Sequence, residues 1–166
     1  RGLADGALMH ASARGASRID YQRLEFLGDR VLGLVVADML YGDFPDAPEG
    51  ELSVRLNALV NAEALAEIAD EAGISALIRS GSDVRALSAR NRVNLRADAI
   101  EALIAALYLD GGLEAAKAFI HRWWRPRSSA SAAPRRDPKT ELQEWAHQVS
   151  GAAPVYETLS RQGPDH

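Results

Sequence analysis

Two pairs of carboxylates are the side chains of this sequence whose types and spacing could do chemistry. Glu25 and Asp29 are four residues apart, and Asp98 and Glu101 are three residues apart, each pair among apolar neighbours. On a helix, such spacing places both members of a pair on one face. Like charges one turn apart repel, and burial raises the cost of keeping both ionised. A cation between the carboxylates would remove that cost.

The chemistry of such an arrangement is the binding of a hard divalent cation. Two helices with one pair each could bring four oxygen ligands together, which suits Mg²⁺ or Mn²⁺ and not zinc. The alternative is that each pair lies on a solvated helix face, because charged side chains are seldom buried without a partner. With both pairs considered together, spacing alone supports the two interpretations about equally.

Helical periodicity predicts the elements that position these pairs. Asp20 is a suitable N-cap for a helix that runs to about Tyr41. The second carboxylate helix is predicted over about 95–109, where Asp110-Gly111-Gly112 would end it. Further helices are predicted over about 50–60, 61–73, 113–124 and 139–149, with a loop over 79–93 and a strand over 154–160.

A boundary between two domains is predicted at residues 126–136. This stretch includes Ser128–Pro134, which has no large apolar side chain and is typical of a flexible linker, with a frayed tail as the alternative. Residues 1–125 would then form an all-helical domain. Residues 137–166 would supply one helix and one strand, the beginning of a smaller α/β domain that cannot bury a core of its own.

Composition excludes several classes of protein. The 166 residues contain no cysteine, which excludes disulfides, thiolate zinc sites and cysteine nucleophiles. No apolar run reaches the roughly 18 residues that a membrane span needs, so we expect a cytoplasmic protein without a membrane partner. The net charge of −4 argues weakly against nucleic acid. Residues 1–120 hold 18 acidic and 12 basic side chains, however, and bound divalent ions would offset part of that excess.

The segment Gln22–Leu32, which reads QRLEFLGDRVL, resembles the signature of the ribonuclease III family. Two later segments, Glu49–Ser53 and Ala97–Ile104, are similar to further conserved parts of its nuclease domain, in the expected order. Asp137–Glu144 is similar to the opening of the double-stranded-RNA-binding domain that follows in bacterial members. The resemblance covers nearly the whole chain and implies an all-helical nuclease domain, a linker and part of that second domain.

The resemblance also assigns roles to individual residues. It implies four metal-binding catalytic carboxylates: Glu25, Asp29, Asp98 and Glu101. Glu49 matches a further acidic position near the cleavage site, and Phe26 matches an aromatic residue that packs across the dimer interface. Thr140, Gln143 and Glu144 match positions that contact the RNA minor groove.

The activity implied by the resemblance is hydrolysis of phosphodiester bonds in double-stranded RNA by a homodimer. The cofactor would be Mg²⁺, with Mn²⁺ as a substitute, and the products would carry 5′-phosphate and 3′-hydroxyl ends, in the processing of rRNA and other structured RNA. The duplex would be recognised through its shape, 2′-hydroxyls and phosphates. Arg90, Arg92 and Arg96 could contact phosphates or be ordinary solvated arginines, and both interpretations stay open.

Several features bear on rival interpretations. Gln22 occupies a position where many bacterial members carry glutamate, so we expect a secondary effect on RNA contact or metal affinity. Trp123 and Trp124 are predicted to be core residues at a helix end. The four histidines lie away from the carboxylates in the sequence; His10 is predicted to be structural or loop-capping, and His121, His147 and His166 are predicted to lie at the surface. The alternatives are a non-catalytic RNA-binding relative that kept the fold and an unrelated helical metal-binding domain. Loss of a carboxylate would favour the former, yet all four are present.

Overall fold

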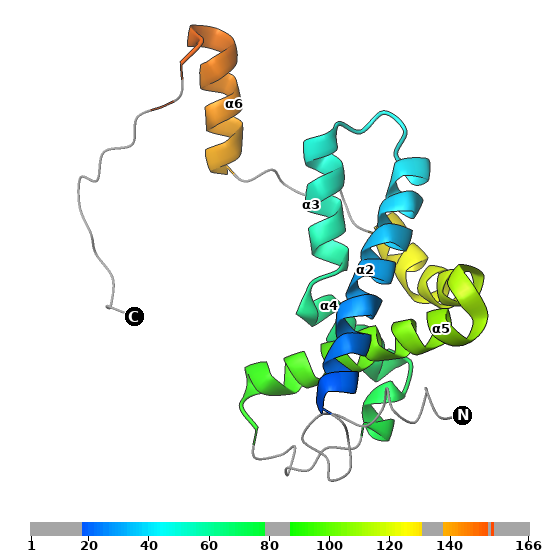
Figure 1. Ribbon diagram of the computed structural model, residues 1–166. Coiled ribbons are helices and arrows are strands. Elements are labelled where there is room, and N and C mark those ends of the chain that lie inside the picture. Colours follow the sequence, from blue (N-terminus) through cyan, green and yellow to red (C-terminus); the bar gives the residue numbers. More distant parts are fainter. Residues whose placement is uncertain (1–17, 79–86, 131–137, 153, 155–166) are drawn as a thin grey trace. The chain divides into compact units, whose positions relative to one another are not determined.

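The structure of the chain is a computed structural model, which describes residues 18–78, 87–130, 138–152 and 154. The described residues form helices and contain no strand, which confirms the mainly α fold class (Figure 1). The helices are α2 (Arg18–Asp43), α3 (Glu49–Leu59), α4 (Ala62–Glu71), the 3-10 helix η1 (Ile74–Leu77), α5 (Ala89–Ala130) and α6 (Pro138–Ser150). The strand predicted over 154–160 lies outside the described residues, apart from Pro154.

The chain divides into two compact units, Arg1–Pro134 and Arg135–His166. Helices α2 to α5 belong to the first unit and α6 to the second. Helix α6 begins at Pro138, one residue before its predicted start, and a proline suits the first turn of a helix. The α/β character of the second unit stays a prediction.

The core of the first unit lies where α2 and α4 pack against α5. Apolar residues recur every three or four positions along α2, so one face of this helix is buried. Among the fully buried side chains are Leu32 and Val36 of α2, and Ile100 and Ile104 of α5. Burial of side chains of this size contributes about 1.5–3 kcal/mol each. This packing holds the two predicted carboxylate helices together.

A kink at Gly112 divides α5 into two helical parts. Gly112 has a φ of 72° and a ψ of −172°, a conformation that glycine adopts without the penalty that a side chain brings. The predicted helix end at Asp110-Gly111-Gly112 is therefore where the chain changes direction. Beyond the kink, Trp124 is fully buried and its Nε1 donates a hydrogen bond of 2.8 Å to the carbonyl of Leu59. Its predicted place in the core is confirmed.

Helix α5 continues to Ala130, so residues 126–130 are helical although they were predicted to belong to the linker; residues 131–136 of that linker lie outside the described residues. Two of the serines that indicated a linker lie within the last turns of this helix. Ser129 donates its hydroxyl to the carbonyl of Arg125 at 3.0 Å, and Ser128 is 2% exposed. Arg127 is joined to Glu71 of α4 at 2.6 Å. The burial of Ser128 and the pairing of Arg127 with Glu71 are tertiary contacts that local composition does not reveal.

The first turn of α5 also differs from the prediction. The helix begins at Ala89, although residues up to 93 were expected to be a loop. Ser88 caps it, since its Oγ accepts a hydrogen bond of 3.2 Å from the backbone amide of Asn91. Likewise α2 begins at Arg18, two residues before the predicted cap Asp20. Residues 79–86 of the predicted loop lie outside the described residues.

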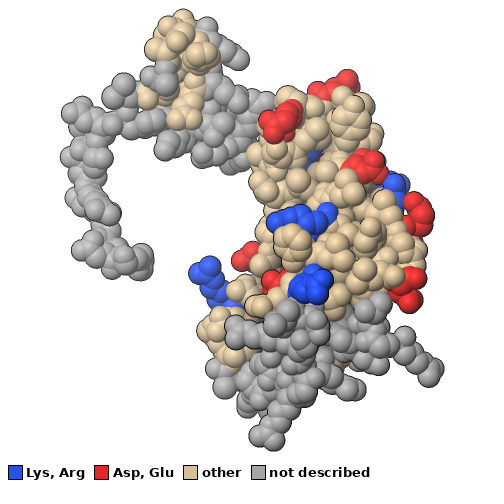
Figure 2. Space-filling model, viewed as in Figure 1, with Lys and Arg blue, Asp and Glu red and all other residues tan. Residues whose placement is uncertain are grey.

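The visible surface of the first unit carries acidic and basic side chains interspersed with one another (Figure 2). Several of them form ion pairs between helices, among them Lys117 with Asp38 at 2.9 Å and Arg96 with Asp70 at 2.8 Å. Exposed pairs of this kind contribute little to stability, about 0–1 kcal/mol each. Across the described helices, none combines the length and the apolar character needed to cross a membrane.

Candidate metal centre

The crossing of α2 and α5 brings the two acidic motifs together at Gly28. A Cβ built on Gly28 would lie 1.8 Å from the carbonyl oxygen of Glu101 and 2.5 Å from its carbonyl carbon. These atoms belong to the backbone, so they cannot move aside as a flexible side chain would. Only glycine therefore permits the two helices to approach this closely, with Glu25 one turn before the crossing.

Three carboxylates meet beside this crossing. Oxygen atoms of Glu25, Asp98 and Glu101 lie within 4.8 Å of one another, and all three residues are partly buried. One carboxylate comes from α2 and two come from α5, so the structure brings together three of the four acids in the two predicted pairs. For these three residues, the structure favours the cluster over the solvated helix face.

The electrostatics of the cluster show the cost of bringing these acids together. Burial, followed by the charges of Asp98 and Glu25, raises the pKa of Glu101 to about 7, against a smaller lowering effect of Arg30. Burial and the charge of Glu25 raise the pKa of Asp98 to about 6. Burial also raises the pKa of Glu25. All three shifts disfavour the ionised form, so a cation held by the cluster would relieve them.

Tyr21 is a neighbour of the cluster that sequence reasoning missed. Its side chain is 3% exposed and packs with Ala102 and Ala106 of α5. Burial, followed by the charge of Asp98, raises the pKa of its hydroxyl above the ordinary value. The available signal was its position four residues before Glu25, which places both residues on one helix face. Tyr21 thus helps to join the two helices that carry the carboxylates.

Asp29, the fourth predicted ligand, does not belong to the three-carboxylate cluster. Its side chain is 39% exposed and its Oδ2 is paired with the guanidinium of Arg30, which is 66% exposed. The same guanidinium lies over the ring of Phe26, 5.1 Å from the centroid. One turn of α2 thus holds an acid, a base and an aromatic ring beside the cluster.

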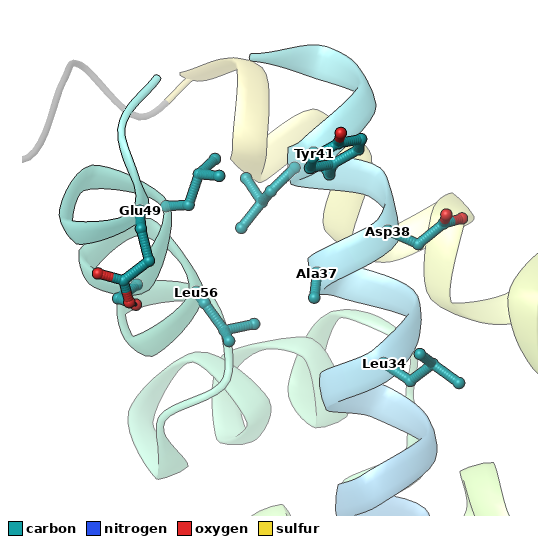
Figure 3. Close-up of a pocket in the computed structure, with 9 residues that line it drawn as sticks. Leu34, Ala37, Asp38, Tyr41, Glu49 and Leu56 are labelled. Carbon is teal, nitrogen blue, oxygen red and sulfur yellow. The ribbon is translucent and has the colours of Figure 1, made fainter. Parts of the chain in front are cut away.

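Glu49 lies in the first turn of α3, and it is not among the three clustered carboxylates. Its Oε1 accepts a hydrogen bond of 2.9 Å from the hydroxyl of Ser53. Both residues line a pocket of about 430 Å³ between α2 and α3. Ala37 of α2 and Leu56 of α3 lie on facing sides of this pocket (Figure 3).

The remaining predicted site residues fall in different places. Phe26 is 65% exposed on α2, available for a contact outside the chain. Gln143 is exposed on α6. Thr140 and Glu144 lie on the same helix, but their side chains are outside the described part of the structure.

The three arginines before the second acidic motif differ in their contacts. Arg96 is paired with Asp70, and Arg92 donates to the carbonyl of Leu87, so both are engaged within the chain. Arg90 is exposed. Of these three arginines, Arg90 is therefore the strongest candidate for contact with a phosphate.

The histidines are not part of the cluster, within the described residues. His147 is exposed, as expected of a surface residue. His121 was also predicted at the surface, but it is partly buried and burial lowers its pKa. His10 and His166 lie outside the described residues.

The donor set of the cluster fits a hard divalent cation. It contains carboxylate oxygens and, among the described residues, no histidine or cysteine, a composition that suits Mg²⁺ or Mn²⁺. Burial, followed by the neighbouring carboxylates, raises the pKa values of Asp98 and Glu101, and a bound cation would favour their ionised forms. The cluster is therefore a candidate metal centre.

Comparison with known proteins places the chain among nucleases. Residues 1–127 match the family model described as Ribonuclease-III-like. The chain is 73% identical over 161 residues to Ribonuclease 3 of Mesorhizobium japonicum, covering 96% of this chain and 73% of that protein. It is 62% identical over 160 residues to Ribonuclease 3 of Brucella canis, covering 96% of this chain and 65% of that protein.

Solved structures agree with the sequence comparison. A nuclease domain of ribonuclease III from Campylobacter jejuni, described with a flexible region involved in dimer formation, is 34% identical with a TM-score of 0.65. That likeness covers 75% of this chain and 86% of the other. Dicer from Pichia stipitis, at 24% identity and a TM-score of 0.61, is alike in fold; the match covers 99% of this chain and 75% of that one. By its sequence and its fold, the chain belongs to the ribonuclease III family.

Proposed function

We propose that this chain is an endoribonuclease that hydrolyses phosphodiester bonds of double-stranded RNA with a divalent cation. The products would carry 5′-phosphate and 3′-hydroxyl ends, and the substrates would include rRNA and other structured RNA. The observation that carries the proposal is the cluster of Glu25, Asp98 and Glu101 at the crossing of α2 and α5. These residues lie within the two motifs that resemble the family's carboxylate helices.

Carboxylates from both helices are proposed to hold the cation. Glu25 supplies an oxygen from α2, and Asp98 and Glu101 supply oxygens from α5, while Asp29 is proposed as a fourth ligand. The cation is proposed to be Mg²⁺, with Mn²⁺ as a substitute. When bound, such an ion supplies a nucleophilic water near neutral pH and stabilises charge on the attacking and leaving oxygens. The burial of Asp98 and Glu101 keeps both carboxylates partly shielded from solvent, which strengthens their attraction for the ion.

Recognition of the duplex is proposed to depend on its shape and backbone. Glu49 would act as a secondary acidic residue near the cleavage site, held by Ser53. Arg90 is available for a phosphate, and Thr140, Gln143 and Glu144 would contact the minor groove through α6. The cytoplasmic location stays a prediction of the sequence.

A homodimer would let two such sites act on the two strands of a duplex. An exposed stripe runs along α2, in which Phe26, Leu34, Ala37 and Tyr41 recur at helical spacing. Phe26, Leu34 and Tyr41 are 65%, 61% and 77% exposed, which is unusual for large apolar side chains. A second copy of the chain is the occupant that we propose for this stripe.

Cleavage of a long RNA duplex in Mg²⁺ tests the proposed activity. Glu101→Gln removes one charged ligand without changing side-chain size, and we expect the rate to fall about a hundredfold or more, the scale of losing one electrostatic contact in an active site. Glu67→Gln is the matched control, because Glu67 is an exposed glutamate of α4 outside the cluster. A wild-type chain that is inert with Mg²⁺, or a Glu101→Gln variant that cuts as fast, would contradict the proposal and favour a non-catalytic RNA-binding relative.

A further inference from the structure

Asp29 is the fourth predicted metal ligand, but its carboxylate is paired with a side chain of the protein. Asp29 is one turn beyond Glu25 on α2, yet its carboxylate is paired with Arg30 and lies outside the cluster of three. The partner is the next residue along the chain and is permanently charged, because a guanidinium does not lose its proton in proteins. Asp29 is thus already neutralised by a cation that belongs to the chain.

Arg30 is also in electrostatic reach of the cluster. Its charge lowers the pKa of Glu101, against the larger effects of burial and neighbouring acids that raise it. Its guanidinium lies 5.1 Å from the centroid of the Phe26 ring, a second favourable contact for the cation. Arg30 therefore contacts Asp29 and Phe26 while acting on the field at Glu101.

We propose that Arg30 is a positioning residue, an internal counter-ion that competes with the divalent cation for Asp29. The inference rests on the proposed metal function of the cluster. Asp29 exchanges the guanidinium for the bound ion, and Arg30 keeps its contact with the Phe26 ring as it releases the carboxylate. The exchange is accessible because an ion pair between side chains that are 39% and 66% exposed is weak. Arg30 thereby lowers the affinity of the site for metal.

Titration of the chain with Mn²⁺ alone, followed by calorimetry without RNA, measures this competition. Arg30→Gln should bind Mn²⁺ about two- to fivefold more tightly, the range that an exposed ion pair supports. Arg30→Lys keeps the charge and should stay closer to wild type. In an Asp29→Asn background, Arg30→Gln should change the affinity much less, because the carboxylate that links the two cations is gone.

Arg23→Gln is the matched control, since it removes the same charge from an exposed position on the same helix. Equal tightening by Arg23→Gln would mean a general effect of net charge and would overturn the role of Arg30. Unchanged affinity in Arg30→Gln, or an undiminished effect in the Asp29→Asn background, would also overturn it. A wild-type chain that binds no Mn²⁺ would refute the metal centre itself, a result distinct from metal binding that ignores Arg30.

Discussion

At the scale of single residues, the candidate metal centre is a cluster of partly buried carboxylates whose pKa values are raised. Burial and mutual repulsion both disfavour the ionised forms of Asp98 and Glu101. The same two causes make the site receptive to a cation, because binding one removes the repulsion. The metal-free chain is therefore less stable than it would be if these carboxylates did not lie together.

We expect this cost to appear as a pH dependence of stability in the metal-free chain. The folded pKa of Glu101, about 7, lies above its ordinary value of 4.5, so the folded state holds the proton more tightly than the unfolded state. Its contribution to stability is fully present below about pH 4.5 and is lost as the pH rises through about 7. Glu101→Gln should therefore be more stable than wild type at pH 8, by roughly 1–2 kcal/mol after allowance for solvent screening.

Thermal melts from pH 4 to pH 8, with a chelator present, measure this difference. Added Mg²⁺ should stabilise wild type at high pH and leave Glu101→Gln less affected. If wild type and Glu101→Gln lose stability in parallel across this range, Glu101 does not carry the raised pKa.

At the scale of elements, the centre depends on how closely α2 and α5 cross. Helix propensity favours the formation of α2 and α5, but the size of the residue at their contact sets the distance between the two helices. Gly28 supplies that contact, because its missing side chain leaves room for the backbone of Glu101. Tyr21 packs the same two helices together with Ala102 and Ala106.

Gly28→Ala should therefore separate the helices. Its Cβ would lie 1.8 Å from a backbone oxygen, so the expected loss is about 1–3 kcal/mol of unfolding free energy, or more, together with weaker metal binding. Gly33→Ala is the control on the same helix, because nothing lies within 4 Å of the added Cβ. That control should gain up to about 1 kcal/mol from helix propensity. Chemical denaturation of both variants decides the matter; equal behaviour would contradict the close crossing.

At the scale of the whole molecule, one helix serves two surfaces. The inner face of α2 packs into the core, while its outer face carries the exposed stripe that includes Phe26 and Leu34. Arg30 and Asp29 lie on the same helix next to the metal centre. If a second copy covers the stripe, the two proposed sites of a dimer are tied to their interface through α2.

Phe26→Ala should weaken such a dimer. Large aromatic side chains at the centre of an interface often contribute about 2 kcal/mol or more, so the dissociation constant should rise about thirtyfold. Leu109→Ala is the control, since Leu109 is 50% exposed on α5 outside the stripe. Light scattering across a dilution series measures the mass, and a Phe26→Ala mass that matches wild type at every concentration would count against this interface.

The sequence by itself determined the helical class, the signature segment and the two pairs of acids that share a helix face, because spacing along a helix is a local property. Which of these acids meet depended on how α2 and α5 cross. Glycines also indicated the helix ends at Gly73 and near Gly112, where the structure has a positive φ that glycine adopts readily. Tertiary structure decided the rest. It extended α5 to Ala130 through contacts such as the pairing of Arg127 with Glu71, where composition indicated a linker. It also separated Asp29, which is paired with Arg30, from the other three acids. The position of the Asp29 carboxylate relative to the acids of α5 depends on the distance between the two helices, which the spacing of residues within one helix does not determine.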